Sequence, residues 1–102
     1  MPSSLQAADY SAAIQYLRAA KATGTDDADK VLAYLRENKL DDVYIKNGVV
    51  RPDGRVVHDM YLLQVKTPEE SKAPWDYFKV VQTIDGNEAF TTKAETRCAL
   101  WK

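Results

Sequence analysis

The chain changes from a helical to an extended pattern of apolar residues near its middle. A first helix is predicted from Ser4 to Ala22, where apolar side chains recur every three or four positions, and Gly24 is expected to stop it. A second helix is predicted to follow, with Thr25 or Asp26 as its N-cap, and to end near Asn38. The apolar side chains that define these helices are Leu5, Ala8, Ala12, Ala13, Tyr16, Leu17 and Ala20, followed by Ala28, Val31, Leu32 and Leu35.

A turn divides the extended half of the chain into strands. In the sequence Arg-Pro-Asp-Gly at residues 51–54, proline fixes the backbone of the second turn position, Asp53 bonds locally to the backbone, and Gly54 accepts a positive φ. Two valines precede this turn, and a long strand from Arg55 to Lys66 is predicted to follow it. Apolar residues occupy both alternating faces of that strand beyond Met60, so we expect both faces to be covered there.

The other segments have weaker patterns. Residues 42–46 fit either a short strand or a final helical turn. Residues 66–74 are predicted to form a polar loop, because Pro68 and Pro74 exclude regular strand pairing. A further strand is predicted from Trp75 to Ile84. The tail after residue 88 has no clear period, and its expected anchors are Phe90, Leu100 and Trp101.

Composition narrows the class of protein. The chain has 102 residues, of which 45% are hydrophobic and 28% are charged, as in an ordinary globular domain with one modest core. Its net charge is −1 and the basic residues form no stripe, which argues against a nucleic-acid partner. The longest central apolar run, Met60–Leu63, is far too short to span a bilayer.

Two groups of polar residues are candidates for chemistry. His58 and Asp59 could form a base with an orienting carboxylate, but neighbours in a strand point to opposite faces, which favours a structural histidine. Asp26, Asp27 and Asp29 could hold a metal ion, but their spacing fits a capped helix start and lacks the glycine and closing glutamate of a calcium loop. We therefore expect no metal site and no cofactor.

Neither the aromatic residues nor the cysteine indicates catalysis. Trp75, Tyr77 and Phe78 could form a stacking platform, but no positive charge accompanies them, so they are expected to anchor a core. Cys98 is the only cysteine and has no partner for an internal disulfide. Because the chain contains no pairing of a nucleophile with a base and no glycine-rich phosphate loop, it is not expected to be an enzyme.

Seven blocks of the chain occur in an order and spacing that are specific to one protein family. The chain resembles the C-terminal part of type 1 periplasmic substrate-binding proteins of ABC transporters, in particular the branched-chain amino acid receptor group. Members of that group are several times longer, and the resemblance covers only about their last quarter. The matching blocks are Gln6–Ala12, Gly24–Asp29, Lys46–Gly48, Asp53–Arg55, His58–Leu62, Gln64–Lys66 and Ser71–Tyr77.

The resemblance implies an α/β protein of two lobes joined by crossing strands, which closes on a small ligand. Taken alone, the chain would be an α+β piece of that fold, with two N-terminal helices followed by a small, mainly antiparallel sheet. Residues 1–54 match the N-terminal lobe, and residues 55–102 match the crossing strand and hairpin of the C-terminal lobe. The hinge would fall near Val57 to Met60. Tyr10 is the residue expected to face the ligand, although helix packing would equally explain it.

The resemblance also implies a function and partners. The parent protein would bind a branched-chain amino acid or a similar small polar molecule in the periplasm and deliver it to a membrane permease. This chain is expected not to bind such a ligand alone. Residues 1–6 contain no signal peptide, and Met1 matches an internal Met-Pro pair of longer relatives, so the chain as written is expected to stay in the cytoplasm. The alternative is a stand-alone interaction module that forms a homodimer.

Overall fold

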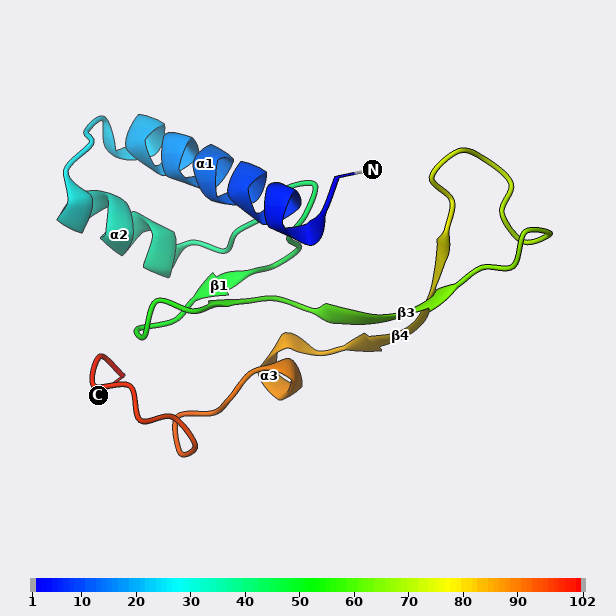
Figure 1. Cartoon of the computed structure of the whole chain (residues 1–102). Coiled ribbons are helices and arrows are strands. Elements are labelled where there is room, and N and C mark those ends of the chain that lie inside the picture. Colours follow the sequence, from blue (N-terminus) through cyan, green and yellow to red (C-terminus); the bar gives the residue numbers. More distant parts are fainter. Residues whose placement is uncertain (1, 102) are drawn as a thin grey trace.

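The computed structural model describes residues 2–101, so the expectation for Met1 lies outside the described residues. Two helices pack side by side over a short hairpin, and a long two-stranded ribbon projects away from them (Figure 1). The predicted architecture of two N-terminal helices followed by small antiparallel sheets is confirmed. The elements in chain order are α1 (Ser4–Thr23), α2 (Ala28–Glu37), β1 (Val49–Val50), β2 (Val56–Val57), β3 (Met60–Val65), β4 (Phe78–Ile84) and α3 (Gly86–Ala89).

Helix α1 begins and ends where the sequence predicts, within one residue. Ser3 and Gln6 form a capping box in which each side chain accepts the other's backbone N–H, and Gly24 ends the helix at a φ of 67°. Its buried face differs from the prediction, since it consists of Ser11, Gln15 and Ala19. The prediction that the apolar side chains of α1 form its buried face is wrong, because Ser11 and Gln15 bind a neighbouring loop. The leucines of α1 therefore face solvent.

Helix α2 starts later than predicted. Asp27 is its N-cap, and the carboxylate accepts the N–H of Lys30 at 3.1 Å. The predicted cap at Thr25 or Asp26 is wrong. The Thr25 hydroxyl instead accepts the N–H of Asp27, so that residues 25 and 26 belong to the turn before the helix. The helix ends at Asn38 as predicted.

The β1–β2 hairpin forms around the predicted turn. The N–H of Gly54 donates to the carbonyl of Arg51 at 2.9 Å, and Gly54 has a φ of 84°. Asp53 holds the turn from inside, because its carboxylate accepts two bonds from the Arg51 guanidinium and one from the N–H of Arg55. The guanidinium lowers the pKa of Asp53. The turn prediction is confirmed.

The segment before β1 is neither a strand nor a helical turn. Residues 41–47 form a loop that is closed by backbone bonds between Leu40 and Gly48. Leu40 and Ile45 are buried at 5% exposure each and form the small core beneath the helices. Gly48 is required there because a Cβ would lie 2.4 Å from Cγ2 of Ile45.

The long strand predicted from Arg55 to Lys66 is interrupted at His58 and Asp59. The carboxylate of Asp59 accepts the N–H of Gly86, and the carbonyl of Asp59 bonds to Nδ1 of His58. These bonds turn the chain between two separate sheets, so β2 pairs with β1 while β3 pairs with β4. The single-strand prediction is wrong because local side-chain bonds replace the ladder at this point.

Strands β3 and β4 form an antiparallel ribbon with a bulge after Leu62. The second strand begins at Phe78 instead of Trp75. The register places one set of apolar side chains together, which we call the apolar ribbon face. Its members are Tyr61, Leu63, Val65, Phe78 and Val80. The opposite face carries Met60, Leu62 and Ile84 near the base of the ribbon and becomes polar toward its tip at Gln82, Gln64 and Lys79.

The expected covering of this region is wrong for the chain as it stands. Every residue of β3 is exposed, and Trp75, Tyr77 and Phe78 are exposed as well, so they anchor no core here. The radius of gyration is 16.6 Å, whereas a compact domain of this length has about 13 Å. The accessible surface is 7837 Å², against about 5,800 Å² for a compact monomer. The chain therefore leaves about 2,000 Å² more surface exposed than a self-contained domain.

The tail returns beneath the hairpin (Figure 1). Phe90 packs edge-on against the ring of His58, and the Arg51 guanidinium lies 4.0 Å from the ring centre of Trp101. Leu100 is 72% exposed, so its prediction as an anchor is wrong. Among the described residues, no helix is both long and apolar enough to cross a membrane.

Replacing Gly54 by valine is expected to lower the free energy of unfolding by about 1–2 kcal/mol. The loss comes from backbone strain at positive φ, because a Cβ here meets no atom within 4 Å. Urea unfolding of both proteins measures it. The control is Gly54→Asn, which tolerates left-handed backbone and should lose less. An unchanged unfolding midpoint for the valine variant would contradict the turn assignment.

Candidate functional site

An open groove runs along the first turns of α1. Its volume is about 660 Å³. The residues that line it are Pro2, Gln6, Ala7, Tyr10, Val43 and Tyr44. It contains the residue that the sequence predicts to face a ligand, Tyr10. The groove is therefore the candidate site.

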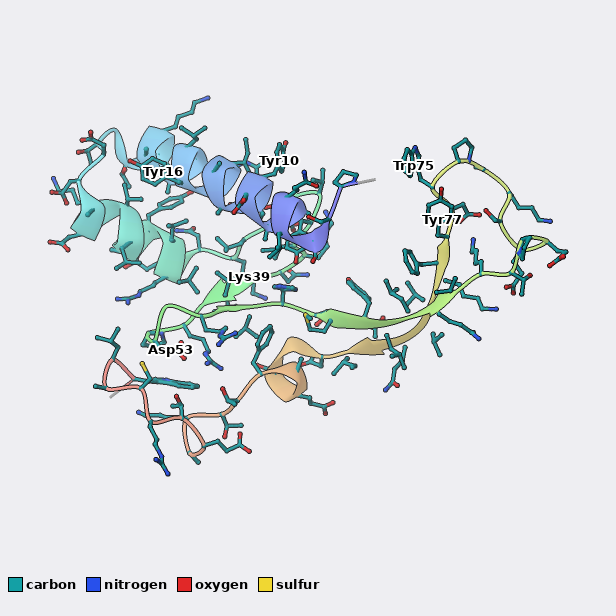
Figure 2. The ribbon with its side chains drawn as sticks, viewed as in Figure 1. Tyr10, Tyr16, Lys39, Asp53, Trp75 and Tyr77 are labelled. Atoms are coloured by element: carbon teal, nitrogen blue, oxygen red, sulfur yellow. The ribbon has the colours of Figure 1, made fainter. Side chains whose placement is uncertain are left out.

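The wall from α1 is set by helical spacing. Gln6, Ala7 and Tyr10 lie three and four positions apart and share one face of the helix. The capping box fixes the start of this face, since the Gln6 side-chain oxygen accepts the N–H of Ser3 at 2.8 Å. Tyr10 is 55% exposed and projects from the outer side of α1 (Figure 2). Its ring is accessible to a ligand.

The opposite wall is a loop that is organised by Asp42. Oδ1 of Asp42 accepts the N–H groups of Tyr44 at 2.7 Å and Ile45 at 2.9 Å, which fixes the loop in a tight turn. This turn points Val43 outward, at 85% exposure, into the groove. The ring of Tyr44 lies 5.6 Å from that of His58. The loop is thus fixed by the hydrogen bonds of its backbone to Asp42 and by the packing of the Tyr44 ring.

The same carboxylate ties the loop to α1. Oδ2 of Asp42 accepts the hydroxyl of Ser11 at 2.7 Å and the amide of Gln15 at 2.8 Å. Arg18, one turn further along α1, donates to the carbonyl of Asp41 at 2.6 Å. Both walls of the groove are therefore connected through one buried side chain, since Asp42 is only 9% exposed.

Hydrogen bonding dominates the electrostatics of Asp42. Burial raises the pKa of a carboxyl group, but the bonds from Ser11, Ile45, Gln15 and Tyr44 outweigh it and lower the pKa of Asp42 to about 2. The group is therefore charged at every physiological pH. With four donors around it, the buried charge is fully satisfied.

The composition of the groove limits what it can bind. None of its lining residues is charged, and they include the Tyr10 ring and the Val43 side chain. An amino acid carries an ammonium and a carboxylate group, and each needs a charged or hydrogen-bonding partner when it leaves water. The groove supplies apolar contact, the phenol groups of Tyr10 and Tyr44 and the Gln6 amide, but no charged group that neutralises either charge.

The structure places the other sequence candidates in structural roles. The ring of His58 packs between Tyr44 and Phe90, and Asp59 binds the backbone of Gly86, so the two do not form a catalytic pair. The aspartates near the start of α2 act through the Asp27 cap, as the helix-start interpretation predicts. In the described part of the chain, no three His, Cys, Asp or Glu side chains come close enough to share a metal ion.

A second groove of about 520 Å³ lies where β2 meets α3. It is lined by charged groups of both signs: the cations Lys39, Lys46 and Arg51 and the anions Asp59 and Asp85. Lys46 pairs with Asp41, and Arg51 pairs with Asp53. The groove therefore contains local ion pairs that hold the loops together, and also Lys39, which forms no ion pair within the described residues.

Sequence similarity decides the family. The sequence profile of a family described as periplasmic binding protein matches residues 1–73. The chain belongs to the periplasmic binding protein family. Such proteins are binding proteins, which fits the expectation that the chain is not an enzyme. No curated protein sequence is significantly similar to the chain.

Two solved structures from this family resemble the chain over its whole length. One is a periplasmic binding protein from Burkholderia mallei, with 64% identity and a TM-score of 0.91. The other is a branched-chain amino acid ABC transporter periplasmic ligand-binding protein from Burkholderia xenovorans, with 50% identity and a TM-score of 0.92. The chain spans 27% of the length of each. Its elongated shape is therefore also adopted within much longer periplasmic binding proteins.

The sequence predicts a role for Tyr10 but gives no prediction for the residues that hold its groove. Ser11 and Gln15 interrupt an alanine-rich helix at positions four apart, and this spacing places both on one face. Asp42 follows another aspartate in a loop whose structure the pattern left open. The available signal was a polar pair inside an otherwise apolar helix, which indicates a buried partner.

Protonation of Asp42 is expected to destabilise the chain at low pH. The folded pKa of about 2 lies below the ordinary value of 3.8, so the stabilisation is complete above about pH 5 and is lost as the pH falls through about 4 to about 2. The full contribution is about 2 kcal/mol, and about half is lost at pH 3. Urea unfolding from pH 6 to pH 2 measures it.

The variant Asp42→Asn isolates this group from other carboxyl groups whose pKa is lowered, such as Asp53 and Glu70. It should be less stable than the wild type at pH 6, and the difference should shrink toward pH 2. The matched control is Asp41→Asn, which changes an exposed neighbour that is paired only with Lys46. A constant difference between the wild type and Asp42→Asn across this range would contradict the account.

Proposed function

We propose that the chain is part of the solute-binding component of an ABC transporter, for a branched-chain amino acid or a similar small polar ligand. The observation that carries this proposal is the TM-score of 0.92 to the Burkholderia xenovorans protein, at 50% identity over the entire chain. Such identity supports a shared role for the segment as well as a shared backbone. In the intact receptor, the partners are the ligand and the membrane permease, and the compartment is the periplasm.

The proposal assigns a place to each part of the chain. Residues 1–54 belong to the N-terminal lobe and residues 55–102 to the C-terminal lobe. The interruption at His58 and Asp59 lies within the expected hinge segment, because the chain there changes from one sheet to the other. Tyr10 contributes its ring to the ligand cleft from the N-terminal lobe. Its exposure and its place in an uncharged groove support this role.

The chain alone does not bind the ligand in this account. The groove at Tyr10 is open and has no charged lining residue. Ligands of this kind are held between two lobes that close on them. Because the chain spans 27% of its solved relatives, the groups that hold the ammonium and carboxylate belong to the other part of the receptor.

A chimeric receptor tests the proposal. The segment of the Burkholderia xenovorans protein that matches this chain is replaced by residues 1–102, and binding of leucine, isoleucine and valine is measured by isothermal titration. We expect saturable binding by the chimera and none by the isolated chain, with the unaltered receptor as the reference. Saturable micromolar binding to the isolated chain, or a folded chimera that binds none of the ligands that the reference binds, would contradict the proposal.

Variants of the chimera test Tyr10. Tyr10→Ala is expected to weaken binding about tenfold, which corresponds to the loss of about 1.4 kcal/mol of ring contact. Tyr16→Ala is the matched control, since Tyr16 is a 45% exposed tyrosine of the same helix that does not line the groove. Equal affinity of the Tyr10 variant and the control would assign Tyr10 to helix packing alone.

The second candidate is a stand-alone interaction module that associates with itself. The observation that favours it is the apolar ribbon face, which the chain leaves exposed together with both edges of a two-stranded sheet. Faces and edges of this kind favour pairing with another chain. Such a module would form a homodimer and would bind no solute.

For the isolated chain we expect self-association, in its simplest form a symmetric dimer. Light scattering coupled to size exclusion over a dilution series measures the mass. Leu63→Asp on the apolar ribbon face should shift the equilibrium toward the monomer, whereas Gln64→Asp on the opposite face should not. A monomeric mass at high micromolar concentration, with a cooperative thermal transition, would show that the chain covers its own surface.

A further inference from the structure

The apolar ribbon face lacks a partner within the chain. Its residues are exposed by 53% (Tyr61), 49% (Leu63), 69% (Val65), 42% (Phe78) and 60% (Val80). Cross-strand register brings them together, since Leu63 lies opposite Val80 and Val65 opposite Phe78. A contiguous apolar surface of this kind marks an interaction site.

The rest of the chain is not arranged to cover this face. Helices α1 and α2 pack against each other and α2 packs against β1, while the ribbon extends to the other end of a molecule that is 51 Å long (Figure 1). Trp75 and Tyr77 lie at that far end, well away from Tyr10 and Tyr16 on α1 (Figure 2). The Asp59 carboxylate accepts the N–H of Gly86 at 3.1 Å, which joins the two strands at the base of the ribbon.

We infer that the apolar ribbon face docks on the part of a periplasmic binding protein that lies outside this segment, so that the chain can complete such a protein as a separate polypeptide. The inference rests on the proposed function. The same backbone conformation occurs in two proteins in which this segment is 27% of the length. The occupant is thus a polypeptide that presents a complementary apolar surface, provided by the other lobe-forming sequence.

The exposed area distinguishes this occupant from a second copy. The chain exposes about 2,000 Å² beyond a compact monomer of its size, which is enough for a stable interface. This excess is spread over several places, including the ribbon, Leu5 and Leu17 on α1, and Trp75. A two-fold contact through the ribbon would cover only one of them, whereas a longer polypeptide reaches them all.

Docking also accounts for the asymmetry of the ribbon. The opposite face carries Met60, Leu62 and Ile84 near the base of the ribbon and becomes polar toward its tip at Gln82, Gln64 and Lys79, where Lys79 forms an ion pair with Glu70. The polar part of this face suits solvent. Toward the tip, the apolar ribbon face therefore makes the contact, and the polar part of the opposite face provides a matched control.

Co-purification tests the inference. The Burkholderia mallei protein without its matching segment is expressed with an affinity tag, together with the untagged 102-residue chain. We expect the wild-type chain to elute with the tagged polypeptide in an equimolar complex. The double variant Leu63→Asp and Val80→Asp should reduce the recovered chain at least tenfold. The control with Gln64→Asp and Gln82→Asp adds the same charges to the opposite face and should leave recovery unchanged.

Cysteine labelling provides a second readout that needs no destabilising charge. In a Cys98→Ser background, Leu63→Cys should react with a maleimide in the free chain and be protected in the complex, while Gln64→Cys should react in both. Three outcomes would overturn the inference. The tagged polypeptide could stay insoluble in the presence of the wild-type chain, or the two double variants could be recovered equally. The chain could also remain a homodimer that does not exchange its partner for the tagged polypeptide. A complex that forms but binds no leucine, isoleucine or valine would preserve the docking and count against the proposed ligand instead.

Discussion

The hydrogen bonds to the carboxylate of Asp42 hold together the part of the molecule that contains the helices. This carboxylate accepts bonds from two side chains of α1 and from two backbone amides of its own loop, so one buried group joins segments about thirty residues apart. The loop, in turn, carries Val43 and Tyr44 to the groove and Ile45 to the core. The helix therefore packs through polar residues, and its leucines are left for another surface.

Stability is consequently unequal along the chain. The helices, the Asp42 loop and the β1–β2 hairpin share the buried residues Ala19, Val31, Leu40 and Ile45. The ribbon has its ladder of backbone bonds and the ion pair between Lys66 and Asp76, but none of its residues is buried. A two-stranded ribbon in water is marginal without a covered face. The same backbone conformation occurs in two solved proteins of which the chain spans 27% of the length.

Local chemistry in the sequence predicted the elements with strong signals. The helices, the Gly24 stop and the Pro-Asp-Gly turn depend on nearby residues, and all are present. The break at His58 was not predictable from periodicity, because it depends on a bond from Asp59 to Gly86, far along the chain. The buried face of α1 was missed for the same reason, since its partner Asp42 lies in a loop without a pattern. Tyr10 could be proposed only through family resemblance, and its groove depends on that distant loop.

We infer that this chain contains one self-supporting unit and one ribbon that needs an outside partner. Native-state hydrogen exchange on the isolated chain, at a dilution where it is monomeric, tests this most directly. The account predicts protected amides in α1 and at Tyr44 and Ile45, whose N–H groups bind Asp42, and exchange close to unfolded rates throughout β3 and β4. Equal protection of the ribbon and of α1 in the monomer would contradict it.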